Sequence, residues 1–160
     1  MKRKEMMPML TFRRVDVEKD KQTIIRFFTD TDEELQFNES EYIKYAKQKQ
    51  LNFPEGFVLL ERDQQVVGEL VLRYDHYEGR EIGYVSFVYV IPEGRGKGYS
   101  KEIFQYAEEQ FKKRNLLEYH LRVAQSNLRA IKFYEKQGLE RLGEERNSYN
   151  QRCWRMRKKM

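Results

Sequence analysis

The stretch YVSFVYVIPEGRGKGYS, residues 84–100, decides the fold of this chain. Its first part, residues 84–91, is apolar on both alternating faces, a pattern typical of a strand in the middle of a sheet. Pro92 ends that strand, a glycine-rich turn follows, and an apolar stripe with helical spacing then predicts a helix to about residue 114. Because free backbone N–H groups and the positive end of a helix dipole meet at such a junction, it favours phosphate binding.

Working outward, the chain shows the pattern of a mixed α/β sheet (α/β or α+β), with helices on both of its faces. The expected order is strand, two helices, three strands, helix, strand, helix and two strands. The expected strands are 10–15, 57–61, 66–74, 84–91, 119–124, and a final pair from 139 and over 151–158. The other expected helices begin after Asp16, run over about 38–50, and run over 127–137.

The length and charge of the chain limit its class. Its 160 residues match roughly one domain of 150 residues, so we expect a single domain over 1–160. Charged residues make up 36%, against about 25% in typical domains, which indicates a soluble protein. The net charge of +5 favours an anionic ligand, but the basic residues are too evenly spread for a nucleic-acid arm.

Cysteine and histidine are scarce. Cys153 is the single cysteine and His76 and His120 are the two histidines, which excludes an intrachain disulfide and makes a zinc cluster implausible. A reducing cytoplasm is the expected location. No segment approaches 18 consecutive apolar residues, so we expect no export or membrane anchoring.

Two common phosphate motifs fail at the glycine turn. A dinucleotide fingerprint would need a glycine where Tyr99 stands, and a P-loop would need Ser or Thr after Lys97, where Gly98 stands. The remaining pattern, Val90-x-Pro92-x-x-Arg95-Gly96-Lys97-Gly98-x-Ser100, resembles the acyl-coenzyme A (CoA) loop of the GCN5-related N-acetyltransferase (GNAT) family. Ser100 departs from the Gly or Ala usual in that family, although a small residue still fits.

A second motif strengthens the resemblance. Leu121-x-Val123-x-x-x-Asn127-x-x-Ala130-x-x-Phe133-Tyr134-x-x-x-Gly138 is similar to the later strand and helix of the family, in the expected order and distance. Together with the element order, the resemblance covers nearly the whole chain. It implies the GNAT fold, with the strands over 84–91 and 119–124 splaying apart at one end to admit the pantetheine arm of acetyl-CoA.

The resemblance also implies which residues contact acetyl-CoA, the expected acyl donor. Backbone groups near Val90 would pair with the pantetheine amides, as an added strand would. The pyrophosphate would lie on the backbone amides of the loop, with Lys101 as a further nearby cation. The expected contact residues are Val90, Arg95, Gly96, Lys97, Gly98, Tyr99, Ser100 and Asn127. The loop can also be a capped turn with solvated charges, and Asn127 can cap its helix in either case.

The resemblance assigns Tyr134 as the general acid toward the departing CoA thiolate, while the alternative is a core aromatic. Some relatives carry a glutamate base where this chain has Arg122. Glu81 is therefore the expected general base. The alternatives are Glu69, or a water held by Tyr84 or Ser86, and all of them can be ordinary strand residues.

Six acidic residues border the first two helices, which flank the acceptor site in this family. They are Asp30, Asp32, Glu33, Glu34, Glu39 and Glu41. They predict a cationic amine acceptor, unless the segment is only a solvated loop. The expected function is acetyl transfer from acetyl-CoA to a primary amine by direct attack in a ternary complex. An acyl-CoA-binding module without transferase activity is the alternative. The acceptor, a longer acyl group and a homodimer all stay open.

Overall fold

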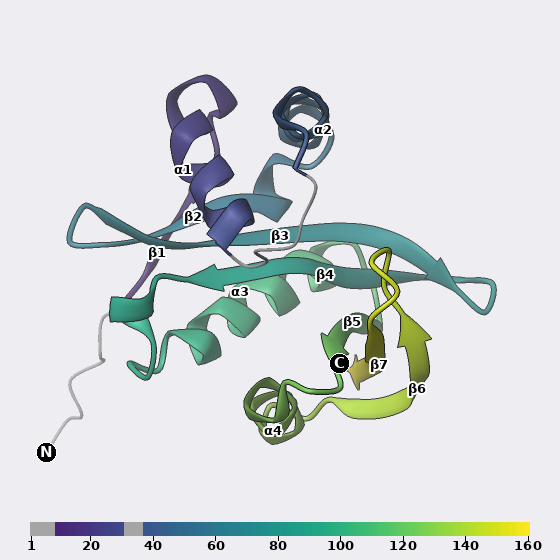
Figure 1. The fold of residues 1–160 in the computed structure, drawn as a ribbon. Helices are drawn as coiled ribbons and strands as arrows, with labels where there is room; N and C mark the ends of the chain where they lie inside the picture. The colour runs from purple at the N-terminus through teal and green to yellow at the C-terminus, as the bar shows by residue number, and fades with distance from the viewer. Residues whose placement is uncertain (1–8, 31–36) are drawn as a thin grey trace, which may run out of the picture. The chain divides into compact units, whose positions relative to one another are not determined.

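The computed structural model describes residues 9–30 and 37–160, and its elements follow the predicted order (Figure 1). The strands are β1 (Thr11–Arg14), β2 (Phe57–Arg62), β3 (Gln65–Tyr77), β4 (Arg80–Val90), β5 (Glu118–Ala124), β6 (Glu140–Arg146) and β7 (Arg152–Lys159). The α-helices are α1 (Val17–Asp30), α2 (Glu39–Asn52), α3 (Tyr99–Lys113) and α4 (Leu128–Lys136), with short 3₁₀ turns η1 (Pro54–Gly56) and η2 (Pro92–Gly94). Asp32, Glu33 and Glu34 lie outside the described residues.

Side-chain caps fix where three of the helices begin. The Asp16 carboxylate accepts the N–H of Glu18 at 3.1 Å, and Asn38 caps α2 in the same way. Asn127 accepts the N–H of Ala130 at 3.1 Å, so its predicted role as a helix cap is confirmed. A short polar side chain satisfies first-turn N–H groups that have no partner inside the helix.

The two central hairpin strands are longer than the sequence pattern predicted. β3 was expected to end at Tyr74 and β4 to begin at Tyr84, but both strands continue to the two-residue turn of Glu78 and Gly79. These turn residues have φ of 50° and 78°, the left-handed geometry that lets paired strands continue up to a two-residue loop. The residues near this turn are polar, so the apolar pattern of the sequence did not indicate that the two strands extend to it.

The strands form one mixed sheet in the order β1-β2-β3-β4-β5-β7-β6, which confirms the predicted fold class. β5 pairs with β4 in parallel and with β7 in antiparallel orientation. The parallel pairing joins Gly83 to Tyr119 and Tyr84 to His120, at the start of β5. Along its whole length, β5 pairs with β7 from Glu118 to Ala124, and the expected divergence of β4 and β5 remains a prediction.

The residues cluster into two compact units that share β3, β4 and α3. The first unit contains residues 1–71 and 87–105, and the second contains 72–86 and 106–160. In the first unit, α1 and α2 lie beside each other on one face of the sheet (Figure 1), and an apolar core includes residues of both helices. In the second unit, the Phe111 ring lies so close to Gly83 that a Cβ there would meet it at 2.5 Å. The prediction of a single domain remains a prediction.

No helix within the described ranges 9–30 and 37–160 is both long enough and apolar enough to cross a membrane.

Candidate functional site

The glycine turn before α3 has the open backbone that an anion needs. Gly96 and Gly98 have φ of 78° and 81°, and a Cβ built on Gly96 would meet no atom within 4 Å. Turns with left-handed residues can form concave sites in which backbone N–H groups bind an anion. The first four N–H groups of the 15-residue helix α3 have no partner inside the helix and add the positive end of its dipole.

The residues next to this turn hold it in place. Tyr99 is buried, and its hydroxyl accepts a hydrogen bond from Arg62 at 2.9 Å. Gly94 is buried as well, and a Cβ there would lie 3.0 Å from Val90 and 3.2 Å from Tyr99. The turn is therefore anchored at both ends, while Gly96, Lys97 and Gly98 between the anchors are exposed.

Arg95 bends back toward the end of β4. Its Nε donates to the carbonyl oxygen of Val90 at 3.1 Å, and its guanidinium lies 5.9 Å from the centre of the Tyr89 ring. A guanidinium carries five N–H donors, so this contact leaves others for an anion. If the pantetheine amides pair with Val90 as predicted, they would either share the Val90 carbonyl oxygen with Arg95 or displace the arginine.

The predicted contacts of the second unit lie on and before α4. Tyr134 and the capping residue Asn127 are separated by two helical turns and share one side of this segment. Burial raises the pKa of the Tyr134 phenol, so the hydroxyl stays protonated at neutral pH and can donate. The Tyr134 ring also packs edge-on against Phe133, 5.8 Å away. The geometry is thus compatible with a proton donor and equally with a packed aromatic.

The expected base, Glu81 of β4, is paired with an arginine. Its carboxylate accepts from Arg114 Nε at 2.5 Å, a contact that lowers the pKa of Glu81. A carboxylate with a lowered pKa is a weaker base. For proton abstraction, Glu81 would have to work while bound to Arg114 or after releasing it.

Glu69 of β3 has the opposite environment. It is fully buried, and neither carboxylate oxygen has a hydrogen-bond partner. Burial, together with the charge of Asp20, raises the pKa of Glu69 to about 8. The sequence pattern showed Glu69 only as one of several strand glutamates, because burial depends on tertiary packing.

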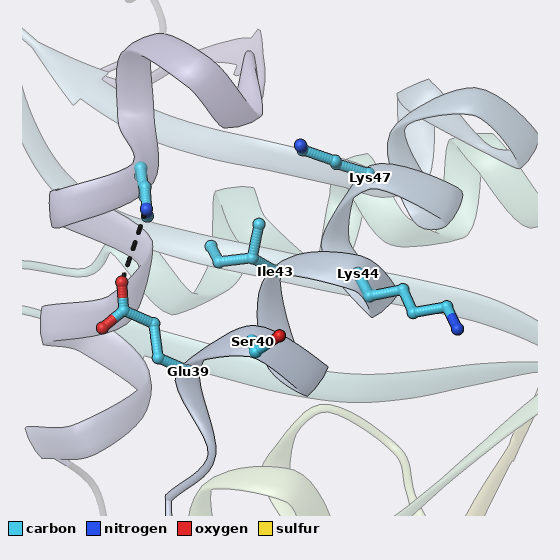
Figure 2. A pocket seen from close by; sticks show the side chains of 6 residues that line it. Glu39, Ser40, Ile43, Lys44 and Lys47 are labelled. Carbon is cyan, nitrogen blue, oxygen red and sulfur yellow. Dashed lines mark ion pairs between the residues drawn. The ribbon is translucent and has the colours of Figure 1, made fainter.

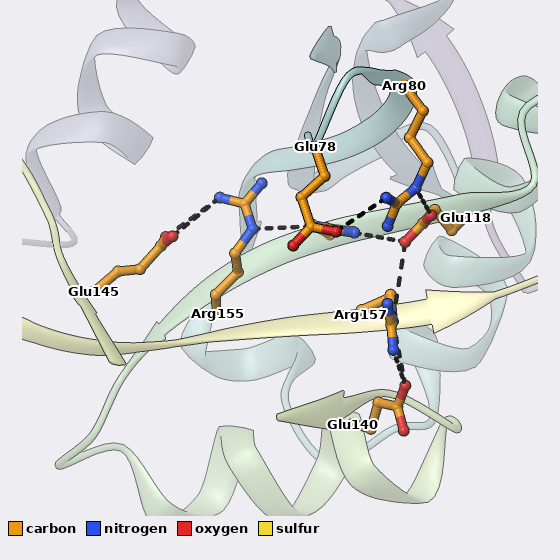
Figure 3. A network of polar contacts seen from close by, with 8 residues as sticks. Glu78, Arg80, Glu118, Glu140, Glu145, Arg155 and Arg157 are labelled. Carbon is orange, nitrogen blue, oxygen red and sulfur yellow. Dashed lines mark hydrogen bonds and ion pairs between the residues drawn. The ribbon is translucent and has the colours of Figure 1, made fainter. Parts of the chain in front are cut away.

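The second unit also contains a buried polar network that the sequence did not reveal (Figure 3). Glu118 accepts from Arg80 and from His120 Nε2, the latter at 2.8 Å. Arg155 Nε donates to His120 Nδ1 at 2.9 Å, and Arg155 also donates to Glu145. Because Nδ1 accepts a hydrogen bond, the His120 ring is neutral, and burial lowers its pKa. His120 is therefore a packed histidine, as expected.

Tyr84, a predicted water-holding residue, lies beside this network. Arg73 stacks on its ring at 3.9 Å, and Arg155 lies 5.7 Å from the ring centre. Ser86 accepts from Arg73 at 3.5 Å. Burial raises the pKa of Tyr84, while three nearby guanidinium groups oppose that rise. Both side chains are thus engaged by arginines.

A groove of about 560 Å³ lies on the first unit (Figure 2). Its lining comes from α1 and α2 and consists of Lys21, Glu39, Ser40, Ile43, Lys44 and Lys47. Lys21 and Glu39 form an ion pair at 3.4 Å. Glu39, one of the six acidic residues of the sequence prediction, thus lines the groove together with three lysines, so basic side chains outnumber acidic ones there.

Comparisons with known proteins identify what the chain is similar to. The family model described as "Acetyltransferase (GNAT) family" matches residues 21–139. A protein of Archaeoglobus fulgidus called an uncharacterized N-acetyltransferase is 30% identical over 90 residues, which cover 54% of this chain. This match spans 61% of the length of that relative.

Solved structures share the fold. Arabidopsis thaliana Naa50, in complex with the bisubstrate analogue CoA-Ac-MVNAL, is 23% identical, with a TM-score of 0.76 over 96% of this chain and 100% of that one. A variant of the spermidine N-acetyltransferase SpeG from Vibrio cholerae is 19% identical, with a TM-score of 0.73 over 94% of each chain. Similarity at this level of identity establishes the architecture.

Proposed function

The chain belongs to the acetyltransferase (GNAT) family, and from this premise we propose that it transfers acetyl from acetyl-CoA to a primary amine. The glycine turn before α3 carries the proposal. Gly96 and Gly98 are exposed left-handed residues at the positive end of a long helix, and a Cβ on Gly96 would meet no atom within 4 Å. Their backbone N–H groups suit the pyrophosphate of CoA, a co-substrate rather than a resident cofactor.

In the proposed reaction, the amine attacks the thioester directly in a ternary complex. A C–N bond forms, the C–S bond breaks, and CoA leaves as a thiolate. Deprotonating an alkyl ammonium of pKa near 10.4 at pH 7 costs about 4.6 kcal/mol, so a base matters. The proposed base is one of two strand glutamates, Glu81 or Glu69, and Tyr134 is the proposed donor to the thiolate, with Arg95, Lys97 and Asn127 as proposed contacts of the donor substrate.

We propose a cationic acceptor and a cytoplasmic location. The acceptor proposal rests on the acidic residues around α1 and α2. Among the similar folds, one protein is named for spermidine and one carries a peptide analogue, so amines of more than one size suit this architecture. A single cysteine, Cys153, buried in β7, fits a reducing compartment.

Mass spectrometry with a mixture of primary amines tests the function. The chain is incubated with acetyl-CoA, and free CoA thiol and acetylated amines are both measured. We expect amine acetylation in equal amount to the thiol released. If the chain bound acetyl-CoA but formed neither free CoA thiol nor an acetylated amine with a broad set of amines, the acyl-CoA-binding module would be favoured instead.

Replacing Tyr134 by phenylalanine tests the proposed proton donor. We expect Tyr134→Phe to lower kcat about 100-fold, because the leaving thiolate loses its donor, and to leave KM for acetyl-CoA nearly unchanged. Tyr149→Phe, in the exposed turn between β6 and β7, is the control and should keep full activity. A kcat for Tyr134→Phe equal to that of the wild type would assign Tyr134 to packing alone.

A further inference from the structure

Glu69 carries a carboxyl group that the packing of the first unit does not require. It pairs across the strands with Leu59, and Val71 is the next residue of β3 on the same face. Leu59 and Val71 both belong to the apolar core beneath α1 and α2. A fully buried carboxyl group with two unpartnered oxygens is costly, and a leucine of similar size would pack there without that cost.

Aromatic side chains gather on the same face of the sheet. Tyr42 and Phe87 pack on the core that contains Leu59 and Val71. The Phe28 ring lies 4.7 Å from Tyr42 and 6.2 Å from Phe87. A fourth ring, Phe37, lies 5.7 Å from Phe28, and all four rings are only half-buried. We call Phe28, Phe37, Tyr42 and Phe87 the aromatic wall.

Charged and titratable groups lie around Glu69. Besides burial, the charge of Asp20 of α1 contributes to the raised pKa of Glu69. Asp20 also forms an ion pair with Arg13 of β1 at 3.0 Å. Arg13 also binds Glu61 of β2, so this guanidinium is already occupied by two carboxylates. The Tyr42 hydroxyl of α2 donates to the Ile24 carbonyl at 3.4 Å. Burial and, next, the charge of Glu69 raise the pKa of Tyr42.

On β4, the Tyr89 hydroxyl donates to Asp30 of α1. The acidic groups on this face of the sheet are thus Asp20, Asp30 and Glu69; Arg13 pairs with Asp20, and the guanidinium groups of Arg26 and Arg95 act on Tyr89. Aromatic faces attract an ammonium group.

Resting on the proposed function, we propose that Glu69 binds the ammonium group of the acceptor beside the aromatic wall and takes its proton. The ammonium R–NH₃⁺ gives one proton to the Glu69 carboxylate and becomes R–NH₂. This amine attacks the acetyl carbon, the C–N bond forms and the C–S bond breaks, and the second proton lost by the nitrogen ends on the CoA thiolate, with Tyr134 as the proposed donor. Glu69 then releases its proton to solvent, so that each turnover frees one proton.

The surroundings also select the class of acceptor. An aromatic wall beside a lone carboxyl group favours a primary ammonium carried on an apolar or aromatic carbon chain. A negative charge on the acceptor would be repelled by Asp20 and Asp30. Phenethylamine is therefore the probe for the proposed class, and β-alanine, which carries a carboxylate, is its counterpart.

Two variants at residue 69 separate a catalytic from a structural role. Glu69→Gln keeps the shape but cannot take a proton, and we expect kcat/KM for phenethylamine to fall about 100-fold or more. Because the pKa of Glu69 is raised to about 8, wild-type kcat/KM should rise with pH to near 8 and then level off, and Glu69→Gln should lack that rise. Glu69→Leu should be inactive yet melt several degrees higher than the wild type. Glu55→Gln, an exposed partner of Arg14, is the matched control and should keep wild-type rates.

The outcomes distinguish this inference from the proposed function. Unchanged rates and pH profile in Glu69→Gln would overturn the role of Glu69, even if amines are acetylated. Acetylation of β-alanine in preference to phenethylamine would overturn the acceptor class. The same would follow if phenethylamine neither bound nor reacted while other amines were acetylated. A chain that binds acetyl-CoA but acetylates no amine would instead refute the transferase proposal, and this inference with it.

Discussion

Gly96→Ala is expected to weaken acetyl-CoA binding by about 10- to 100-fold while leaving the fold intact. Gly96 has φ of 78° and open space around its Cα. A methyl group there occupies the space from which a phosphate would approach, and left-handed geometry costs a non-glycine residue roughly 1–2 kcal/mol. Losing one charged hydrogen bond of about 1.5–3 kcal/mol accounts for the expected change in affinity. Titration calorimetry measures it.

Gly79 offers a matched control for this substitution. It also has φ of 78° with nothing within 4 Å of a built Cβ, but it lies in the turn between β3 and β4. Gly79→Ala should therefore cost a similar amount of stability and leave acetyl-CoA affinity unchanged. Equal loss of affinity in both variants would show that backbone strain, and not occlusion of the glycine turn, explains the result at Gly96.

The second large effect is expected at Glu118, the centre of the buried network. Glu118→Gln should lower the free energy of unfolding by about 3 kcal/mol, because Arg80 and Arg157 lose a shared countercharge and the neutral, buried His120 loses its carboxylate acceptor. For a chain of this length that corresponds to a melting midpoint lower by about 6–12 °C. Glu140→Gln, which removes an exposed partner of Arg157, should cost less than about 1 kcal/mol.

The pH dependence of stability checks the same group. Arg80 and His120 lower the pKa of Glu118 to about 2, below its ordinary value of 4.5. The folded state therefore prefers the ionised form, and its stabilisation is complete above pH 4.5 and lost as the pH falls from 4.5 toward 2. Glu118→Gln should lack this part of the acid-induced loss. An unaltered acid profile in the variant would remove Glu118 from the centre of the network.

Local patterns predicted most of the fold because the relevant interactions are local. The caps at Asp16 and Asn127 act within three residues, and the apolar run over 84–91 reports burial on two faces. The glycine turn was predictable for the same reason, since Gly96 and Gly98 need only their own backbone geometry to become left-handed.

Side-chain environments could not be predicted in this way, because they depend on partners far along the chain. Glu81 and Glu69 look alike in the sequence as strand glutamates. In the fold, one meets Arg114, 33 residues away, and the other is enclosed by apolar groups with no partner for either oxygen. The pKa of Glu81 consequently falls while that of Glu69 rises, which reverses their order as candidate bases.

The most direct test of the central claim is the thermal unfolding midpoint with and without acetyl-CoA, with NAD and ATP as controls. Ligand at 100 times its Kd should add about 2.7 kcal/mol of stability, which raises the midpoint by about 5–10 °C. We predict this rise for acetyl-CoA and not for NAD or ATP. No rise at saturating acetyl-CoA, or an equal rise with all three, would contradict the assignment of the glycine turn to acetyl-CoA.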